Sequence, residues 1–228
     1  MHLSSEELTD DIDPRPLHRR ELLCGGRIWD VVRESVSLTE ESIPFERDFL
    51  DHPGAVAIAV LNEEHQILLI RQYRHPVRAN LWEIPAGLLD VAGETPLEAA
   101  QRELAEEAFL RAKQWDTLME FYNSPGGSTE TCRVFLARDI TPIDQEHQHI
   151  REDEESEIVM RWVNLDDAVT AVLSGRIHNP SATNAILATY VAHQQNFAHL
   201  YSAHAPFEAH PRYRRKDYIG PISPAEKS

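Results

Sequence analysis

The strongest local signal in this chain of 228 residues is an acidic helix that the sequence caps at its start. Thr95 can serve as the N-cap residue, Pro96 occupies the first helical position, and Glu98 completes a capping box. We expect the helix to continue to Glu107. Its apolar stripe consists of Leu97, Ala100 and Leu104. A helix with one apolar stripe buries that stripe against other elements, so this segment must belong to a packed domain.

Another face of the same helix gathers carboxylates. Glu103 and Glu107 are four residues apart and are therefore neighbours on the helix surface, with Glu106 beside them. Arg102 can pair with one of these carboxylates but does not neutralise the group. Oxygen ligands in this number suit Mg²⁺ or Mn²⁺. The spacing alone leaves two interpretations open, a metal site and a solvated acidic helix.

The rest of the chain predicts one mixed α/β domain with strands appended at its N-terminal side. Strand patterns cover residues 22–38, with a turn at Gly25 and Gly26, and then residues 43–50, 55–61, 66–73, 131–137 and 158–163. Helix patterns cover residues 164–174 and 181–195. We therefore divide the chain into a flexible leader (1–21), N-terminal strands (22–50), a main domain (51–204) and an irregular tail (205–228).

Composition narrows the class of partner. The formal charge of −16 argues against a nucleic-acid backbone as the main partner, because phosphate binding by side chains needs clustered Lys and Arg. No apolar run approaches the roughly 18 residues needed to cross a bilayer. The two cysteines are too few for a disulfide framework or a zinc cage, and the 12 histidines lack metal-binding spacing and are interpreted mostly as surface residues. We expect a cytoplasmic protein with a small-molecule partner and no membrane partner.

The segment around the helix resembles the Nudix box, the signature of a hydrolase family. Gly87 is followed by Glu94 and then by the run Arg102-Glu-Leu-Ala-Glu-Glu107. Two departures stand out. The loop before Glu94 holds one residue more than usual, which we expect Gly93 to accommodate, and Phe109 stands where the pattern has Gly. The resemblance implies an α/β/α sandwich with a mixed sheet, here with an N-terminal strand appendage.

The family resemblance also implies roles for individual residues. It places metal ions on Glu103 and Glu107, with Glu106 assisting and the backbone carbonyl of Ala86 as a further ligand. Arg102 would orient the carboxylates, and Glu94 would brace the loop. The cofactor implied is Mg²⁺, with Mn²⁺ as a possible substitute.

Features outside the box resemble the ADP-ribose pyrophosphatases, most of all their actinobacterial members. Pro125 lies fifteen residues after Leu110, and similar segments cover residues 71–76, 81–87 and 175–181. The implied reaction is hydrolysis of ADP-ribose to AMP and ribose 5-phosphate. Two alternatives stay open. One is a Nudix hydrolase of another substrate, such as GDP-mannose, ADP-glucose or NADH, and the other is a non-catalytic nucleotide-sugar sensor. An ordinary Pro-Gly turn is the competing interpretation of Pro125.

The base that activates water in this subfamily is a Glu on a loop after the box. Glu155 is our first candidate and Glu154 the second, because both lie in an acidic run that leaves the register open. A solvated acidic loop is the competing interpretation of that run.

Substrate contacts are also assigned through the resemblance. Arg47 and Arg74 match positions that contact ADP-ribose in similar enzymes and are candidates for the phosphates, Glu83 is a candidate for a ribose hydroxyl, and Trp29 is a candidate platform for adenine. A surface ion pair is the alternative for either arginine, and a core or interface position is the alternative for Trp29. Relatives form homodimers in which N-terminal strands cross to the partner, so we expect a homodimer.

Overall fold

A computed structural model describes residues 2, 4, 7–144, 146 and 157–214. Its strands are β1 (Leu17–Gly25), β2 (Asp30–Val36), β3 (Phe45–Asp51), β4 (Ala55–Val60), β5 (Gln66–Arg74), β6 (Ala79–Glu83), β7 (Ala86–Leu88), β8 (Leu110–Tyr122), β9 (Thr131–Pro142), β10 (Val159–Asn164) and β11 (Tyr201–Ser202). Its helices are η1 (His75–Val77), α1 (Pro96–Ala108), α2 (Leu165–Leu173), α3 (Pro180–Gln194) and α4 (Pro211–Arg214).

The centre of the molecule is a mixed five-stranded sheet in the order β11-β8-β9-β4-β7. Strands β4 and β9 run parallel, and the other pairs are antiparallel. A second sheet has the order β10-β5-β6. The apolar run in β4 is buried on both faces, which explains why it reads as nearly continuous rather than alternating.

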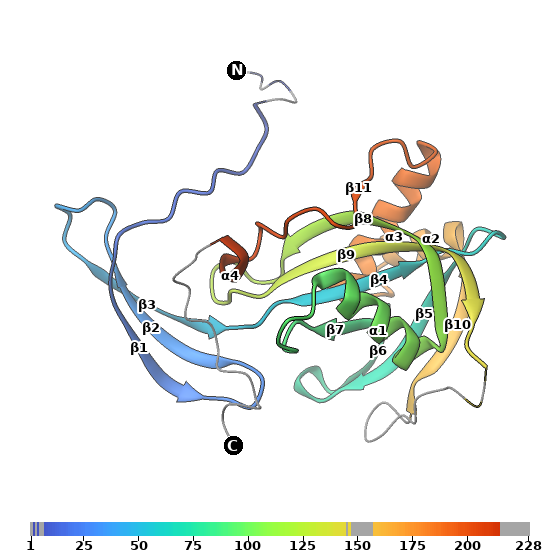
Figure 1. Ribbon diagram of the computed structural model, residues 1–228, viewed down its shortest axis with the longest axis horizontal. Helices are drawn as coiled ribbons and strands as arrows, with labels where there is room; N and C mark the ends of the chain where they lie inside the picture. Colours follow the sequence, from blue (N-terminus) through green and yellow to red (C-terminus); the bar gives the residue numbers. More distant parts are fainter. Residues whose placement is uncertain (1, 3, 5–6, 145, 147–156, 215–228) are drawn as a thin grey trace.

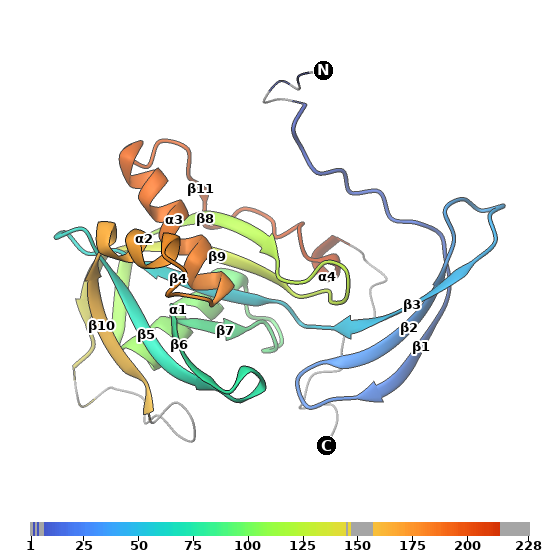
Figure 2. The same cartoon turned by 180° about the vertical axis from the view of Figure 1, so that it is seen from behind.

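Helices cover both faces of the central sheet (Figures 1 and 2). Alternate side chains of β4 point to opposite sides. Ala57 and Ala59 join a buried cluster with residues of α2 and α3, whereas Val56 and Ile58 join a second cluster with residues of α1. The expected α/β/α sandwich with a mixed sheet is confirmed.

The third sheet, β1-β2-β3, stands at one end of the molecule, apart from α1 (Figure 1). It meets the body where the end of β3 reaches the turn between β8 and β9. There the Leu50 N–H donates to the Gly127 carbonyl and the Thr129 N–H donates to the Leu50 carbonyl, both at 2.9 Å. The predicted N-terminal strand appendage is therefore present in the fold.

Three expectations need correction. Strand β1 begins at Leu17, inside the segment interpreted as a leader, because residues 17–25 pair with β2. Strand β8 was not predicted at all. The tail also contains structure: Phe207 and His210 are buried and α4 follows them, whereas residues 215–228 lie outside the described part of the chain.

No helix among the described residues is long and apolar enough to cross a membrane.

Candidate active site

Helix α1 begins with the capping box that its sequence predicts. The Thr95 hydroxyl accepts a hydrogen bond from the Glu98 N–H (3.3 Å), and the Glu98 carboxylate accepts one from the Thr95 N–H (2.8 Å). At the other end Phe109 takes the left-handed conformation with φ 56°, which is the conformation that Gly usually supplies at this position. The helix therefore ends in the usual geometry although the glycine is missing.

The loop between β7 and α1 carries the extra residue of the box. Gly93 has φ +83°, and a side chain added there would meet nothing within 4 Å. Because this φ lies in the region that favours glycine, Gly93 is the residue that lets the longer loop turn toward α1.

The Glu103 carboxylate lies directly against the backbone of β7. A Cβ atom placed on Gly87 would lie 2.1 Å from both Cδ and Oε1 of Glu103, a distance that no real contact allows. Gly87 is therefore required to admit the Glu103 side chain, which keeps only 14% of its surface exposed.

Glu107 reaches the same strand one residue earlier. Its side chain is buried, and its Oε2 accepts a hydrogen bond from the Ala86 N–H at 2.9 Å. Two carboxylates of α1 thus touch consecutive residues of β7, which brings both glutamates to the backbone whose Ala86 carbonyl is a candidate ligand.

Arg102 connects the glutamates of the box. It binds the two oxygens of Glu94 through Nε (3.0 Å) and Nη2 (3.1 Å). Its Nη1 donates to Glu103 (2.6 Å) and to Glu106 (3.1 Å). The hydrogen bonds to Glu94 are the main reason that the pKa of Arg102 is raised above its usual value. Arg102 is thus a permanent cation that limits repulsion between the carboxylates.

These residues form an oxygen-rich donor set that suits a hard divalent cation. Within the described residues, no three His, Cys, Asp or Glu side chains converge closely enough to hold a metal by themselves. A site with only one or two carboxylate ligands fits Mg²⁺, which completes its shell with water and substrate phosphates. Glu103 and Glu107, which contact Gly87 and Ala86 of β7, are compatible with such a site together with Glu106 and the Ala86 carbonyl.

Arg74 and Glu83 lie on the neighbouring strands β5 and β6 and are paired with each other. Arg74 donates through Nε (2.9 Å) and Nη2 (2.7 Å) to the two oxygens of Glu83. Glu83 is almost fully buried, whereas 41% of the Arg74 side chain is exposed. The structure therefore brings these two candidates together as a bidentate ion pair with one exposed end.

The other candidates lie on or beside the N-terminal sheet. Arg47, on β3, places its guanidinium 4.5 Å from the centre of the Phe45 ring. Trp29 stacks on His52 with ring centres 6.0 Å apart and planes at 24°. Pro125 is exposed in the turn between β8 and β9. The hydrogen bonds described above for the α1 carboxylates involve none of these three residues, and the base candidates Glu154 and Glu155 lie outside the described residues.

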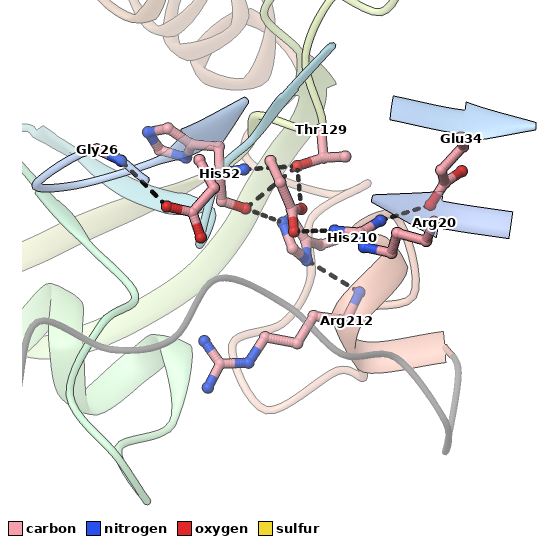
Figure 3. A network of polar contacts seen from close by, with 9 residues as sticks. Arg20, Gly26, Glu34, His52, Thr129, His210 and Arg212 are labelled. Carbon is pink, nitrogen blue, oxygen red and sulfur yellow. Dashed lines mark hydrogen bonds and ion pairs between the residues drawn. The ribbon is translucent and has the colours of Figure 1, made fainter. Parts of the chain in front are cut away.

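A buried polar network that the sequence did not predict joins the end of β3 to the turn between β8 and β9 and to the segment before α4. His52 and His210 are buried and are thus exceptions to the expectation that most histidines lie on the surface. The backbone N–H of His52 donates to the Thr129 hydroxyl at 2.8 Å (Figure 3). Burial of the His52 ring lowers its pKa. No spacing rule could have found this network, because its members come from segments far apart in the sequence.

Comparison with known proteins identifies a family model and relatives that match this chain. The NUDIX domain model matches residues 51–183. An ADP-ribose pyrophosphatase of Mycobacterium tuberculosis (strain ATCC 25618 / H37Rv) is 38% identical over 170 residues, covering 75% of this chain and 80% of that protein. An ADP-ribose pyrophosphatase of Bacillus subtilis (strain 168) is 34% identical over 167 residues, covering 73% and 88%.

A solved structure supports the same fold. The crystal structure of an ADP compounds hydrolase superposes with a TM-score of 0.66 at 17% sequence identity, covering 82% of this chain and 98% of that one. The matched segment, residues 51–183, contains β7, the loop that follows it and α1, where the glutamates meet the strand. The chain therefore belongs to the Nudix hydrolase family.

Proposed function

We propose that this protein is a Mg²⁺-dependent pyrophosphatase that hydrolyses ADP-ribose to AMP and ribose 5-phosphate. The observation that carries the proposal is the contact of Glu103 and Glu107 with consecutive residues of β7, braced by Arg102. The two relatives named ADP-ribose pyrophosphatase support the choice of substrate, since each aligns with about three quarters of this chain.

Glu103 and Glu107 would hold the cation, with the Ala86 carbonyl and Glu106 completing the protein's share of ligands. Bound Mg²⁺, or Mn²⁺ in its place, neutralises diphosphate oxygens and lowers the pKa of water. The protein's own contribution is to hold the carboxylates in place beside a positive charge. Arg102 does this through its hydrogen bonds to Glu94, Glu103 and Glu106.

Arg74 and Glu83 would serve the substrate at the edge of the site. If the partly exposed Arg74 turned a donor from Glu83 to a phosphate, the Glu83 oxygen that it leaves could accept a hydrogen bond from a ribose hydroxyl. Glu155, or Glu154 next to it, would take the proton from the attacking water. This base must come within hydrogen-bond reach of the water in the substrate complex.

A homodimer would complete the nucleotide end of the site. Strand β1 forms an edge of its sheet and exposes apolar side chains: Leu17 (36%), Leu22 (58%) and Leu23 (40%). An edge strand with exposed leucines favours pairing with another chain. Since Arg47 lies on β3 and Trp29 in the turn between β1 and β2, a partner bound at this sheet would meet both residues, and they and Pro125 would bind the nucleotide at the site of the partner.

Substrate profiling tests the specificity. Purified protein with Mg²⁺ would be assayed on ADP-ribose, GDP-mannose, ADP-glucose and NADH, with kcat/KM measured for each. We expect ADP-ribose to be among the best substrates. A clear preference for another of these compounds would leave the diphosphate chemistry intact but overturn the assignment of ADP-ribose, and failure to cleave any of them would favour a non-catalytic sensor.

A further inference from the structure

Residues 203–214 fold back over the body and are called here the C-terminal strap. Its path runs from β11 to α4, at the junction between the body and the N-terminal sheet (Figures 1 and 2). Arg133 fixes the first half: Nη1 donates to the Ala205 carbonyl and Nη2 to the Pro206 carbonyl, both at 2.6 Å. Arg133 is buried, and its guanidinium lies 4.6 Å from the centre of the Phe207 ring. The strap is thus an integral part of the domain.

His210 fixes the second half of the strap to the backbone at the end of β3. Its Nδ1 accepts a hydrogen bond from the Arg212 N–H (3.1 Å), so the proton of the neutral ring is on Nε2. Nε2 donates to the His52 carbonyl at 3.1 Å (Figure 3). Because His52 also stacks on Trp29, the strap is connected to the candidate adenine platform.

Arg212 links the strap to the box. Its Nη1 donates to the Leu89 carbonyl at 3.2 Å, two residues after Gly87. The Leu89 N–H donates to the Gly54 carbonyl at 3.0 Å, and Gly54 lies against the His210 ring, where a Cβ atom would be 3.2 Å from Cδ2. The strap therefore holds the Leu89 carbonyl directly, whereas the Leu89 N–H is held by Gly54, which packs against the His210 ring of the strap.

The side chain of Leu89 is buried in the cluster beside α1, but the loop that follows it is exposed and is spanned by the hydrogen bond from the Glu94 N–H to the Val91 carbonyl at 3.3 Å. Val91 is half exposed, and Gly93 faces open space. A cavity of about 460 Å³ separates the loop from the strap, and its lining includes Glu94 and Arg212. The loop ends at Glu94, the residue that holds Arg102 by two hydrogen bonds. The position of Leu89 therefore affects where Glu94 and Arg102 lie.

We propose that Arg212 is a positioning residue that, anchored through the C-terminal strap, holds the loop from Leu89 to Glu94 in the arrangement needed for metal binding by the box. This inference rests on the proposed function of the box as a metal site. Arg212 acts here through Leu89 and contacts neither substrate nor metal.

The experiment compares Arg212→Met with Arg214→Met in the full-length protein. Both changes remove one positive charge from the strap, but among the described residues Arg214 donates only to another strap residue, from Nη2 to the Ala209 carbonyl at 3.1 Å. Arg212→Lys restores a donor and serves as the conservative variant. For each protein we would measure amide hydrogen exchange in the peptide covering residues 88–95, Mn²⁺ binding by electron paramagnetic resonance, and the melting temperature.

We expect Arg212→Met to speed exchange in this peptide and to weaken Mn²⁺ binding, each by about tenfold, as the loss of a charged hydrogen bond implies. Arg214→Met should leave both unchanged, and Arg212→Lys should restore much of the loss. Equal effects of Arg212→Met and Arg214→Met, or unchanged exchange in Arg212→Met, would overturn the positioning role. Absence of Mn²⁺ binding in the wild type would instead contradict the proposed function, and the exchange data would still decide whether Arg212 holds the loop.

Discussion

The contact between Gly87 and Glu103 explains at the scale of one residue why the box begins with glycine. A methyl group at position 87 would occupy the space of the Glu103 carboxylate, at 2.1 Å from its Cδ. We expect Gly87→Ala to lower kcat/KM by about 100-fold or more, because Glu103 must move away from the site. Steady-state kinetics would measure this loss, and the melting temperature would show that the fold persists.

Gly25→Ala is the matched control for that variant. A Cβ atom at Gly25 would lie 3.7 Å from Oδ1 of Asp30, an ordinary contact. Its activity should equal that of the wild type. If Gly87→Ala were as active as Gly25→Ala, the close approach of Glu103 to β7 would have no role in catalysis.

Sequence and structure differ most at the residues whose partners are far away along the chain. Arg102, Glu103 and Glu107 could be found from the sequence because their relation is local to one helix and the loop before it. His210 could not, because its partner His52 is 158 residues away and only the folded chain buries both. Local spacing therefore reveals the box but not the contacts that support it.

At the scale of elements, the link between β9 and the C-terminal strap is the one that we expect to matter most for stability. Arg133 pairs with Glu120 of β8 through Nε (2.6 Å) and binds two strap carbonyls, while only 1% of its side chain is exposed. Replacing it with Met leaves Glu120 and both carbonyls without this cation. We expect Arg133→Met to reduce the free energy of unfolding by about 3–5 kcal/mol in urea titrations.

An exposed ion pair provides the comparison. Lys113 lies 3.3 Å from Asp139, and both side chains are largely exposed. Lys113→Met should change the free energy of unfolding by less than about 1 kcal/mol. Similar losses in the two variants would contradict the view that burial gives the Arg133 link its strength.

Elements with a strong local signature could be predicted, and those that depend on a partner could not. Strand β4 and helix α1 were recognised from apolar runs, periodicity and caps. Strand β8 was missed because its residues are mostly only partly buried, so its sequence shows no clean alternation, and it gains its order from the long pairing with β9. The strap was missed for the same reason. Its few apolar residues, such as Phe207, show no pattern in the sequence and are ordered by their contact with Arg133 of β9.

At the scale of the whole molecule, the buried network at His210 should make stability depend on pH. Burial is the main reason that the pKa of His210 falls to about 4 from a usual value of 6.5, and the neighbouring Arg212, Arg214 and His52 lower this pKa further. The unfolded chain therefore binds a proton in this pH range more readily than the folded protein does. The stability contributed by neutral His210 is fully present above about pH 6.5 and is lost as the pH falls toward 4, by about 3 kcal/mol.

Urea unfolding of the wild type and of His210→Asn at several pH values between 4 and 7 would isolate this contribution. Asn can still accept the Arg212 N–H but does not titrate. The free energy of unfolding should fall more steeply with acidification in the wild type than in the variant. Parallel curves would contradict the assignment of this pH dependence to His210.

The proposed function depends on the two carboxylates that reach β7 from α1. The most direct test is the rate of AMP release from ADP-ribose with Mg²⁺ in Glu103→Gln and Glu107→Gln, compared with Glu64→Gln, a change at an exposed glutamate in the turn between β4 and β5. We expect both box variants to lose at least about 100-fold in kcat/KM while Glu64→Gln equals the wild type. Unchanged turnover in both Glu103→Gln and Glu107→Gln would contradict the metal site and the function built on it.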